Sequence, residues 1–127
     1  MNDIIVLDVR NKSELISEGK IPKSNNVPFP NIVSGDFELP SPSFQKKYGF
    51  VKPRVTDEII IYCKLGKRAS KAATILTELG YLNVKVYVGS FEDWRANGGY
   101  VVKHGKSFFL KDIYRARVIK YFLFAGH

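Results

Sequence analysis

The sequence has 127 residues, of which 45% are hydrophobic and 25% are charged. This length and composition predict one folded domain with its own core, and they exclude a disordered chain or two domains of ordinary size. The formal net charge is +8. Residues 101–127 hold six basic side chains and one acidic side chain, whereas residues 1–100 hold 14 basic and 11 acidic side chains. Because the basic character belongs mainly to the C-terminal fifth, we expect no nucleic-acid-binding surface on the domain.

The first half of the chain predicts, in order, a buried strand, a short helix, an edge strand and a second helix, over residues 4–9, 13–18, 26–29 and 41–48. The first strand is a continuous run of β-branched residues, and Pro28 confines the second strand to an edge. Ser41 as N-cap, Pro42 as first helical residue and Gly49 just beyond the end mark the second helix. The rest of the proline-rich stretch 22–53 is predicted to be a long connection.

The second half predicts a buried third strand over residues 59–62, a longer helix over 68–79, a fourth strand over 84–88 and a helical turn that Ser90 caps. Strands that alternate with helices predict an α/β fold with a mostly parallel central sheet. Residues 101–127 form a separate basic, aromatic segment. A helix from Ser107 to Tyr121 laid on the core, a membrane- or partner-binding amphipathic segment and a poorly ordered tail are its three interpretations.

Several classes of protein are excluded by residues that the chain lacks. One cysteine and two histidines leave neither a disulfide framework nor a zinc site of the usual kind, so we expect no metal and no cofactor. The acidic residues in MNDIIVLDVR are unlike a signal or transit peptide, and no apolar run is long enough for a membrane span. We expect a monomer in the cytoplasm, or in the mitochondrion if a targeting segment precedes this sequence.

The chemistry is predicted at the point where the third strand ends in Cys63. A short loop follows the cysteine and leads into a helix, and its residues are Lys64, Leu65, Gly66, Lys67 and Arg68. Open α/β sheets place their sites at such strand ends, and amides of the loop and first helical turn form an anion cradle. The cradle and the three cations favour the thiolate of Cys63. No histidine precedes position 104, which excludes a Cys–His dyad in the core.

The length of this loop favours one reaction over another. Four residues separate Cys63 from Arg68, one fewer than in the corresponding loop of protein tyrosine phosphatases. The smaller cradle fits one extra sulfur atom on the cysteine better than a tetrahedral phosphate. Sulfur transfer is therefore favoured, and a small phosphatase is a distant alternative.

Several separated motifs resemble those of one family. They are Asp8-Val9-Arg10 with Glu14, Gly19-Lys20-Ile21-Pro22 followed by Asn26-Val27-Pro28, the loop from Cys63 to Arg68, Leu79-Gly80-Tyr81, and the segment from Val88 to Trp94. Over residues 4–99 the chain resembles a single-domain rhodanese, a thiosulfate sulfurtransferase of the heat-shock-protein 67B2-like kind. The resemblance implies a rhodanese-like three-layer α/β/α domain over residues 1–100.

The resemblance also implies a reaction. Cys63 would take the outer sulfur of thiosulfate or a persulfide donor, and the amides from Lys64 to Arg68 would hold the resulting persulfide. A thiol such as glutathione, a protein cysteine, or cyanide would then accept the sulfur, while Lys64, Lys67 and Arg68 would bind the anionic donor. The alternative is a catalytically idle rhodanese-like module that binds a partner or a membrane surface through residues 101–127.

Overall fold

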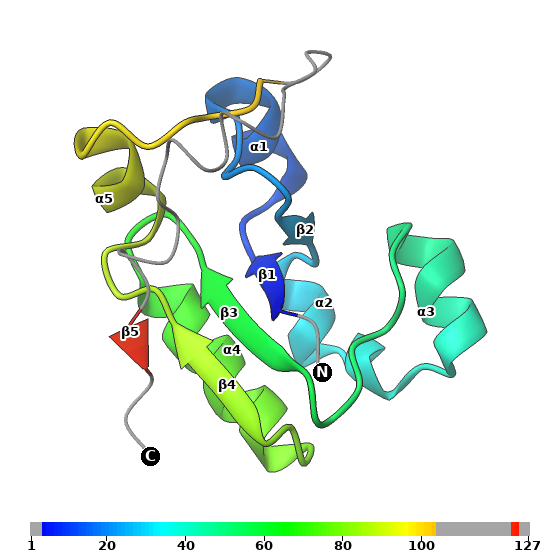
Figure 1. The fold of residues 1–127 in the computed structure, drawn as a ribbon. Helices are drawn as coiled ribbons and strands as arrows, with labels where there is room; N and C mark the ends of the chain where they lie inside the picture. The colour runs from blue at the N-terminus through cyan, green and yellow to red at the C-terminus, as the bar shows by residue number, and fades with distance from the viewer. Residues whose placement is uncertain (1–3, 104–122, 125–127) are drawn as a thin grey trace.

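A sheet of five strands runs through the centre of the molecule (Figure 1). The computed structural model describes residues 4–103 and 123–124. In spatial order the strands are β2 (Asn25–Asn26), β1 (Ile4–Asp8), β3 (Glu58–Tyr62), β4 (Asn83–Val86) and β5 (Leu123–Phe124). The first four are parallel, and β5 pairs antiparallel with β4. The predicted α/β class and mostly parallel sheet are confirmed.

The helices of the described residues connect these strands. They are α1 (Lys12–Glu18), α2 (Phe29–Val33), the 3-10 helix η1 (Asp36–Glu38), α3 (Ser41–Tyr48), α4 (Lys67–Glu78) and α5 (Ser90–Ala96). Figure 1 shows α1 and α5 near the carboxyl ends of β1 and β3, with α2 and α4 behind the sheet. None of the described helices combines the length and hydrophobicity that a membrane crossing requires.

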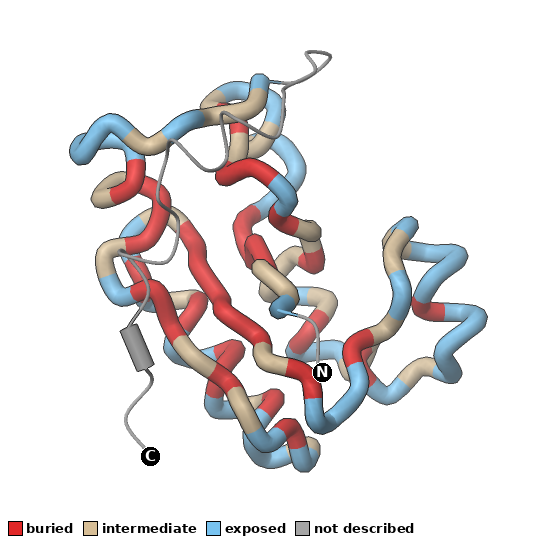
Figure 2. Tube along the Cα trace, viewed as in Figure 1, coloured by how far each residue is buried: buried red, intermediate tan, exposed pale blue. Residues whose placement is uncertain are grey.

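Two apolar cores cover the two faces of the sheet. Because successive side chains of a strand point to opposite faces, Ile59 and Ile61 pack with the alanines of α4 and with Leu76. Ile60 and Tyr62 belong to the other core, with Phe91 and Trp94 of α5. Figure 2 shows β3 buried along most of its length. The central strand therefore holds the two halves of the three-layer domain together, with Phe91 and Trp94 fully buried on one side of it.

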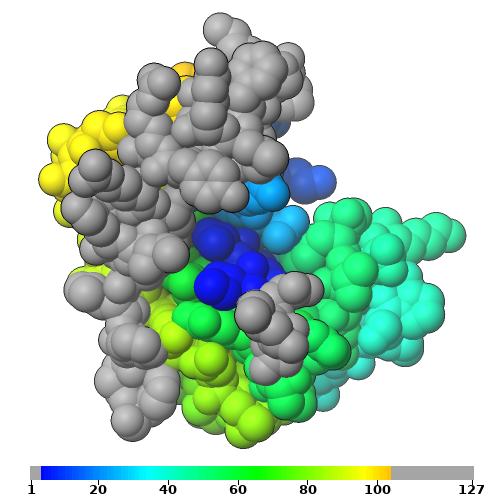
Figure 3. Space-filling view, in the orientation of Figure 1, coloured from blue at the N-terminus to red at the C-terminus, as the bar shows by residue number. Residues whose placement is uncertain are grey.

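The end of the sheet at which β1 and β3 begin is more open than the end at which they finish. Ile4, the first residue of β1, is 56% exposed, and the beginning of the chain (blue) reaches the surface in the space-filling view (Figure 3). The burial of β1 increases along the strand, so that Leu7 and Asp8 are fully buried. The strands thus become most enclosed toward their carboxyl ends.

Three predicted boundaries are wrong in the proline-rich stretch. The strand over 26–29 shrinks to β2, and Phe29 instead begins α2 with Pro30 in its first turn. Proline fits there because the first amides of a helix have no partner within the helix. The N-cap of α3 is Pro40 rather than Ser41, although Gly49 ends the helix as predicted. The stretch was predicted to contain one helix, whereas the structure has α2 and η1 there in addition to α3.

Two differences lie in the second half. The fourth predicted strand, 84–88, is β4 over Asn83–Val86, and Tyr87 and Val88 lie beyond its end. Ser90 is the first residue of α5 and Gly89 occupies the N-cap position. The predicted helix from Ser107 to Tyr121 lies outside the described residues.

Candidate active site

Cys63 directly follows β3 at its carboxyl end. Its Sγ accepts hydrogen bonds from the backbone N–H of Gly66 at 3.0 Å and of Ala69 at 3.4 Å. The residue is 1% exposed and borders the apolar core of α4, yet two peptide dipoles point at its sulfur. This environment stabilises negative charge on Sγ while it keeps bulk water away from the atom.

Gly66 makes this arrangement possible. It is the N-cap of α4 and has φ +110°, in the left-handed region that side-chain-bearing residues avoid. A Cβ atom at this position would lie 2.4 Å from the carbonyl oxygen of Val88. The loop can therefore turn its amides toward Cys63 only because residue 66 has no side chain and the β4–α5 connection packs against it.

The β4–α5 connection also supplies a side chain to the site. Ser90 Oγ accepts a hydrogen bond from the N–H of Cys63 at 3.1 Å, and it lies 2.9 Å from the carbonyl oxygen of Tyr87 and 3.9 Å from Cys63 Sγ. Its single proton is donated to one of these two acceptors. Ser90 has φ +55°, so this contact is made at the cost of backbone strain.

Ser90 is a site residue that the sequence prediction missed, since it treated this serine as a helix cap. The available signal was topological: β3 and β4 are adjacent and parallel, and the carboxyl ends of such strands meet at one edge of the sheet. Backbone bonds from Phe91 to the carbonyl of Cys63 (2.9 Å) and from Glu92 to that of Lys64 (3.1 Å) complete the attachment. The start of α5 thus holds the cysteine loop in place.

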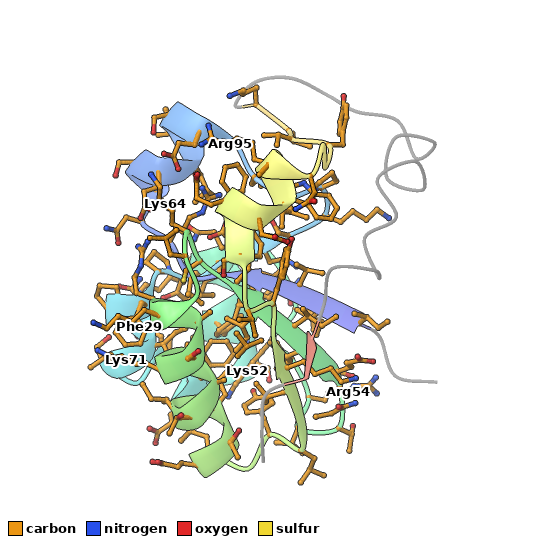
Figure 4. All side chains as sticks on the ribbon, turned by 90° about the vertical axis from the view of Figure 1, so that its left-hand side faces the viewer. Phe29, Lys52, Arg54, Lys64, Lys71 and Arg95 are labelled. Atoms are coloured by element: carbon orange, nitrogen blue, oxygen red, sulfur yellow. The ribbon has the colours of Figure 1, made fainter. Side chains whose placement is uncertain are left out.

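Two cations of the loop, Lys64 and Arg68, form ion pairs with carboxylates of α1. Arg68 donates from both terminal nitrogens to the carboxylate of Glu14, at 2.6 and 3.0 Å. Lys64 donates to Glu18 at 2.9 Å, and Figure 4 shows Lys64 beside α1. The hydrogen bonds from Arg68 lower the pKa of Glu14, and the bond to Glu18 raises the pKa of Lys64.

These ion pairs change the interpretation of the site. The sequence prediction assigned Lys64, Lys67 and Arg68 to the anionic donor, whereas two of the three bind helix α1 in the structure. Lys67 is exposed and has no ion-pair partner among the described residues. Leu65 is 72% exposed at the tip of the loop. The loop is therefore attached to α1 by two charged contacts, and its outer surface carries Leu65 and Lys67.

We expect Glu14→Gln to lower the free energy of unfolding by about 1 kcal/mol at pH 7, because it removes the charge that binds Arg68. Gln retains an oxygen for the N–H of Asn11, which Glu14 accepts at 3.0 Å. Since the folded-state pKa of Glu14 is depressed below its ordinary value of 4.5, the charged form stabilises the fold above that value. The contribution is lost as the pH falls through the folded-state pKa.

Urea denaturation of both proteins at pH 7 and at pH values below 4.5 measures this difference. The stability gap should narrow as the solution becomes more acidic. Glu78→Gln, at an exposed position of α4, is the matched control and should show little gap at either pH. A gap for Glu14→Gln that stays constant with pH would contradict the assignment.

A buried ion pair anchors the start of α1. Arg10 donates from Nη2 to Asp8 at 2.7 Å and to the carbonyl of Gly19 at 2.7 Å, and both charged side chains are fully buried. The guanidinium also lies 4.2 Å from the ring centre of Phe91. The pair has a structural role, because it fixes the segment that carries Glu14 and Glu18 against the sheet.

No cluster of His, Cys, Asp or Glu side chains suited to a metal ion occurs within residues 4–103 and 123–124. The chemistry that this site offers is that of a thiolate held by amides. The β3–α4 loop supplies the nucleophile and its N–H donors, α1 supplies carboxylates for the cations, and the β4–α5 connection supplies Ser90. Neither a histidine nor another general base lies against Cys63 in the contacts of the described residues.

The comparisons with known proteins agree with this geometry. The model of the family described as rhodanese-like domain matches residues 1–97. The chain is 39% identical over 90 residues to the putative mitochondrial thiosulfate sulfurtransferase of Schizosaccharomyces pombe, which covers 71% of this chain and 62% of the relative. It is 38% identical over 97 residues to the thiosulfate:glutathione sulfurtransferase of Saccharomyces cerevisiae, and this match covers 76% of this chain and 68% of the relative.

Solved structures show the same likeness. The human single-domain sulfurtransferase TSTD1 superposes with a TM-score of 0.70 at 29% identity, over 76% of this chain and 84% of that one. The single-domain sulfurtransferase RDL2 of Saccharomyces cerevisiae superposes with a TM-score of 0.68 at 34% identity, over 77% of this chain and 78% of that one. The chain spans less than two thirds of the length of the fission-yeast relative.

Proposed function

Because this chain belongs to the rhodanese-like domain family, we propose that it is a thiosulfate sulfurtransferase that carries sulfur as a persulfide on Cys63. The observation that supports this proposal best is the pair of N–H groups, from Gly66 and Ala69, directed at the cysteine sulfur. Such a cradle stabilises a thiolate, and it does so without a neighbouring base. The relatives named as thiosulfate sulfurtransferases add independent support.

In the first half of the reaction, the Cys63 thiolate attacks the outer sulfur of thiosulfate. A new S–S bond forms to Cys63, and the S–S bond of thiosulfate breaks with its electron pair leaving on sulfite. No proton is transferred, so the site needs no general base once the thiolate is present. The amides of Gly66 and Ala69 stabilise the reacting charge on and next to Sγ.

In the second half, an acceptor thiolate attacks the outer sulfur of the Cys63 persulfide. The acceptor becomes a persulfide, or thiocyanate when the acceptor is cyanide, and Cys63 leaves again as a thiolate. Glutathione is the proposed acceptor class because two relatives are named as thiosulfate:glutathione sulfurtransferases. A protein cysteine is the other acceptor predicted from the sequence.

The remaining loop residues receive proposed roles from their contacts. The backbone of Lys64, Leu65, Gly66, Lys67 and Arg68 forms the wall of the cradle. The side chains of Lys64 and Arg68 fasten this wall to α1 through Glu18 and Glu14. Substrate binding by cationic side chains is therefore concentrated on Lys67 rather than spread over all three.

Other predictions from the sequence keep their standing as predictions. The idle binding module depends on residues 101–127, most of which lie outside the described residues, while the intact Cys63 loop favours an enzyme. The cytoplasmic location is not favoured over the mitochondrion, because the fission-yeast relative is named as mitochondrial. The monomeric state is likewise a prediction.

The mass of the intact protein tests the proposal. After incubation with thiosulfate we expect an increase of about 32 Da, one sulfur atom. Cys63 is the single cysteine of the sequence, so this adduct can be assigned directly. Cyanide or glutathione should remove it. An unmodified mass, together with turnover of para-nitrophenyl phosphate that exceeds sulfur transfer, would contradict the proposal and favour a phosphatase.

A further inference from the structure

A hollow of about 370 Å³ opens beside β2, the strand at one edge of the sheet. Its lining comes from α1, from α3 and from the stretch that joins β2 to α2, and Figure 1 shows β2 between α1 and α3. A volume of this size is typical of small-molecule sites. The loop from Cys63 to Arg68 contributes no residue to the lining, so this hollow is not part of the cysteine site.

The lining combines apolar side chains with positive charge. Leu15 is partly buried and Ile16 is 61% exposed, so α1 offers hydrophobic surface to the hollow. Lys12 and Lys47 also line it, whereas none of the described residues that line it is acidic. Lys47 donates to Asp36 at 2.7 Å, but the Lys12 side chain has no hydrogen bond or ion pair within residues 4–103 and 123–124. The hollow therefore suits a negatively charged group.

One polar atom of the lining lacks the hydrogen bond that its burial requires. Nδ2 of Asn26 donates to the carbonyl oxygens of Asp8 at 2.9 Å and of Arg10 at 2.8 Å. Both protons of the amide are thus used at the end of β1, while the buried Oδ1 of Asn26 has no partner among the described residues. A buried acceptor without a donor costs free energy. A ligand that brings an O–H or N–H group to Asn26 would recover it.

Helix α1 separates the hollow from the cysteine loop. Lys12 and Ile16 are four residues apart and share one face of the helix. At about 100° of rotation per residue, Ile16 lies about 160° around the helix from both Glu14 and Glu18. Those two carboxylates hold the cations of the loop. One face of α1 therefore serves the loop and the opposite face lines the hollow.

We propose that this hollow binds a small organic anion with an apolar body and a hydrogen-bond donor. Lys12 attracts the anionic group, and Leu15 and Ile16 contact the apolar body. The donor binds Oδ1 of Asn26. The site is separate from the one proposed for sulfur transfer, and its occupation does not depend on Cys63.

Binding of 4-hydroxyphenylacetate to the whole chain, followed by NMR, tests the proposal. We expect saturable shifts of the Asn26 side-chain amide and of the Leu15 and Ile16 methyl groups, with a Kd of about 1 mM for a ligand of this size. Phenylacetate lacks the donor and 4-hydroxyphenylacetamide lacks the charge. Each should bind about threefold more weakly than 4-hydroxyphenylacetate.

Lys12→Gln should weaken the binding of 4-hydroxyphenylacetate about threefold and leave that of the uncharged amide unchanged. The matched control is Lys46→Gln, which removes an exposed lysine of α3 that does not line the hollow and should change neither Kd. Thermal unfolding checks that both variants are folded.

Three results would overturn the proposal. The first is no saturable shift at Asn26, Leu15 and Ile16 at concentrations well above the expected Kd. The second is equal affinity for all three compounds, or an equal loss of affinity for the charged and uncharged compounds in Lys12→Gln. The third is a set of shifts confined to the amides of Gly66 and Ala69, which would place the anion at the cysteine instead.

Discussion

Cys63→Ser should reduce sulfur transfer from thiosulfate to cyanide by more than about a thousandfold. A serine hydroxyl does not ionise near neutral pH, and its oxygen cannot replace sulfur in the persulfide that links the two halves of the reaction. The N–H groups of Gly66 and Ala69, which lie 3.0 and 3.4 Å from Sγ, can donate to a hydroxyl oxygen instead. The fold should therefore survive the change.

Steady-state assays and thermal unfolding of the same preparation separate these two effects. The expected result is a melting temperature close to that of the wild type with activity at the level of the uncatalysed reaction. Intact mass should show no adduct after thiosulfate treatment. A serine variant that keeps a substantial share of the activity would mean that Cys63 is not the sulfur carrier.

Gly66→Ala should lower kcat/KM about a hundredfold and destabilise the fold by about 2 kcal/mol. At φ +110° an alanine is strained, and its Cβ would approach the carbonyl oxygen of Val88 to 2.4 Å. Relief of this contact requires the loop to move, and the N–H of Gly66 then no longer points at the sulfur. Loss of one preorganised donor to a reacting charge has an effect of this size on catalysis.

Gly80→Ala is the matched control for this substitution. Gly80 has a similar φ of +101°, but a Cβ atom there would have no heavy atom within 4 Å beyond its own chain neighbours. Strain alone should then cost about 1 kcal/mol in the urea-derived free energy of unfolding, with kcat/KM unchanged. Equal losses of activity in both glycine variants would show that general destabilisation, and not the cradle, explains the effect at position 66.

The site combines three parts of the chain with different tasks. The loop after β3 carries Cys63 and the amides that face it. Helix α1, fixed by the buried pair of Asp8 and Arg10, holds the outside of the loop through Glu14 and Glu18. The start of α5 holds its inside through Ser90. A rigid cradle follows from these attachments, since movement of the loop would break contacts on both sides.

Much of the fold could be predicted from local sequence patterns. The buried run at 59–62, the alanine and leucine stripe of α4 and the glycines after α1 and α3 depend on hydrophobic periodicity and backbone sterics, which neighbouring residues decide. The prediction failed at Phe29 and Ser41 because proline is compatible both with an extended connection and with the first turn of a helix. Packing of α2 against α4 selects the helix.

The sequence by itself determined that a lone cysteine ends a buried strand and is followed by a glycine-containing turn and a helix, since each of these features arises within a few residues of the chain. Only the tertiary structure decided which groups surround that loop. Ser90, Glu18 and Glu14 reach it through contacts that join residues 27, 46 and 54 positions apart. Contacts at such separations depend on how the strands align in the sheet, and this alignment depends on the burial of both sheet faces together.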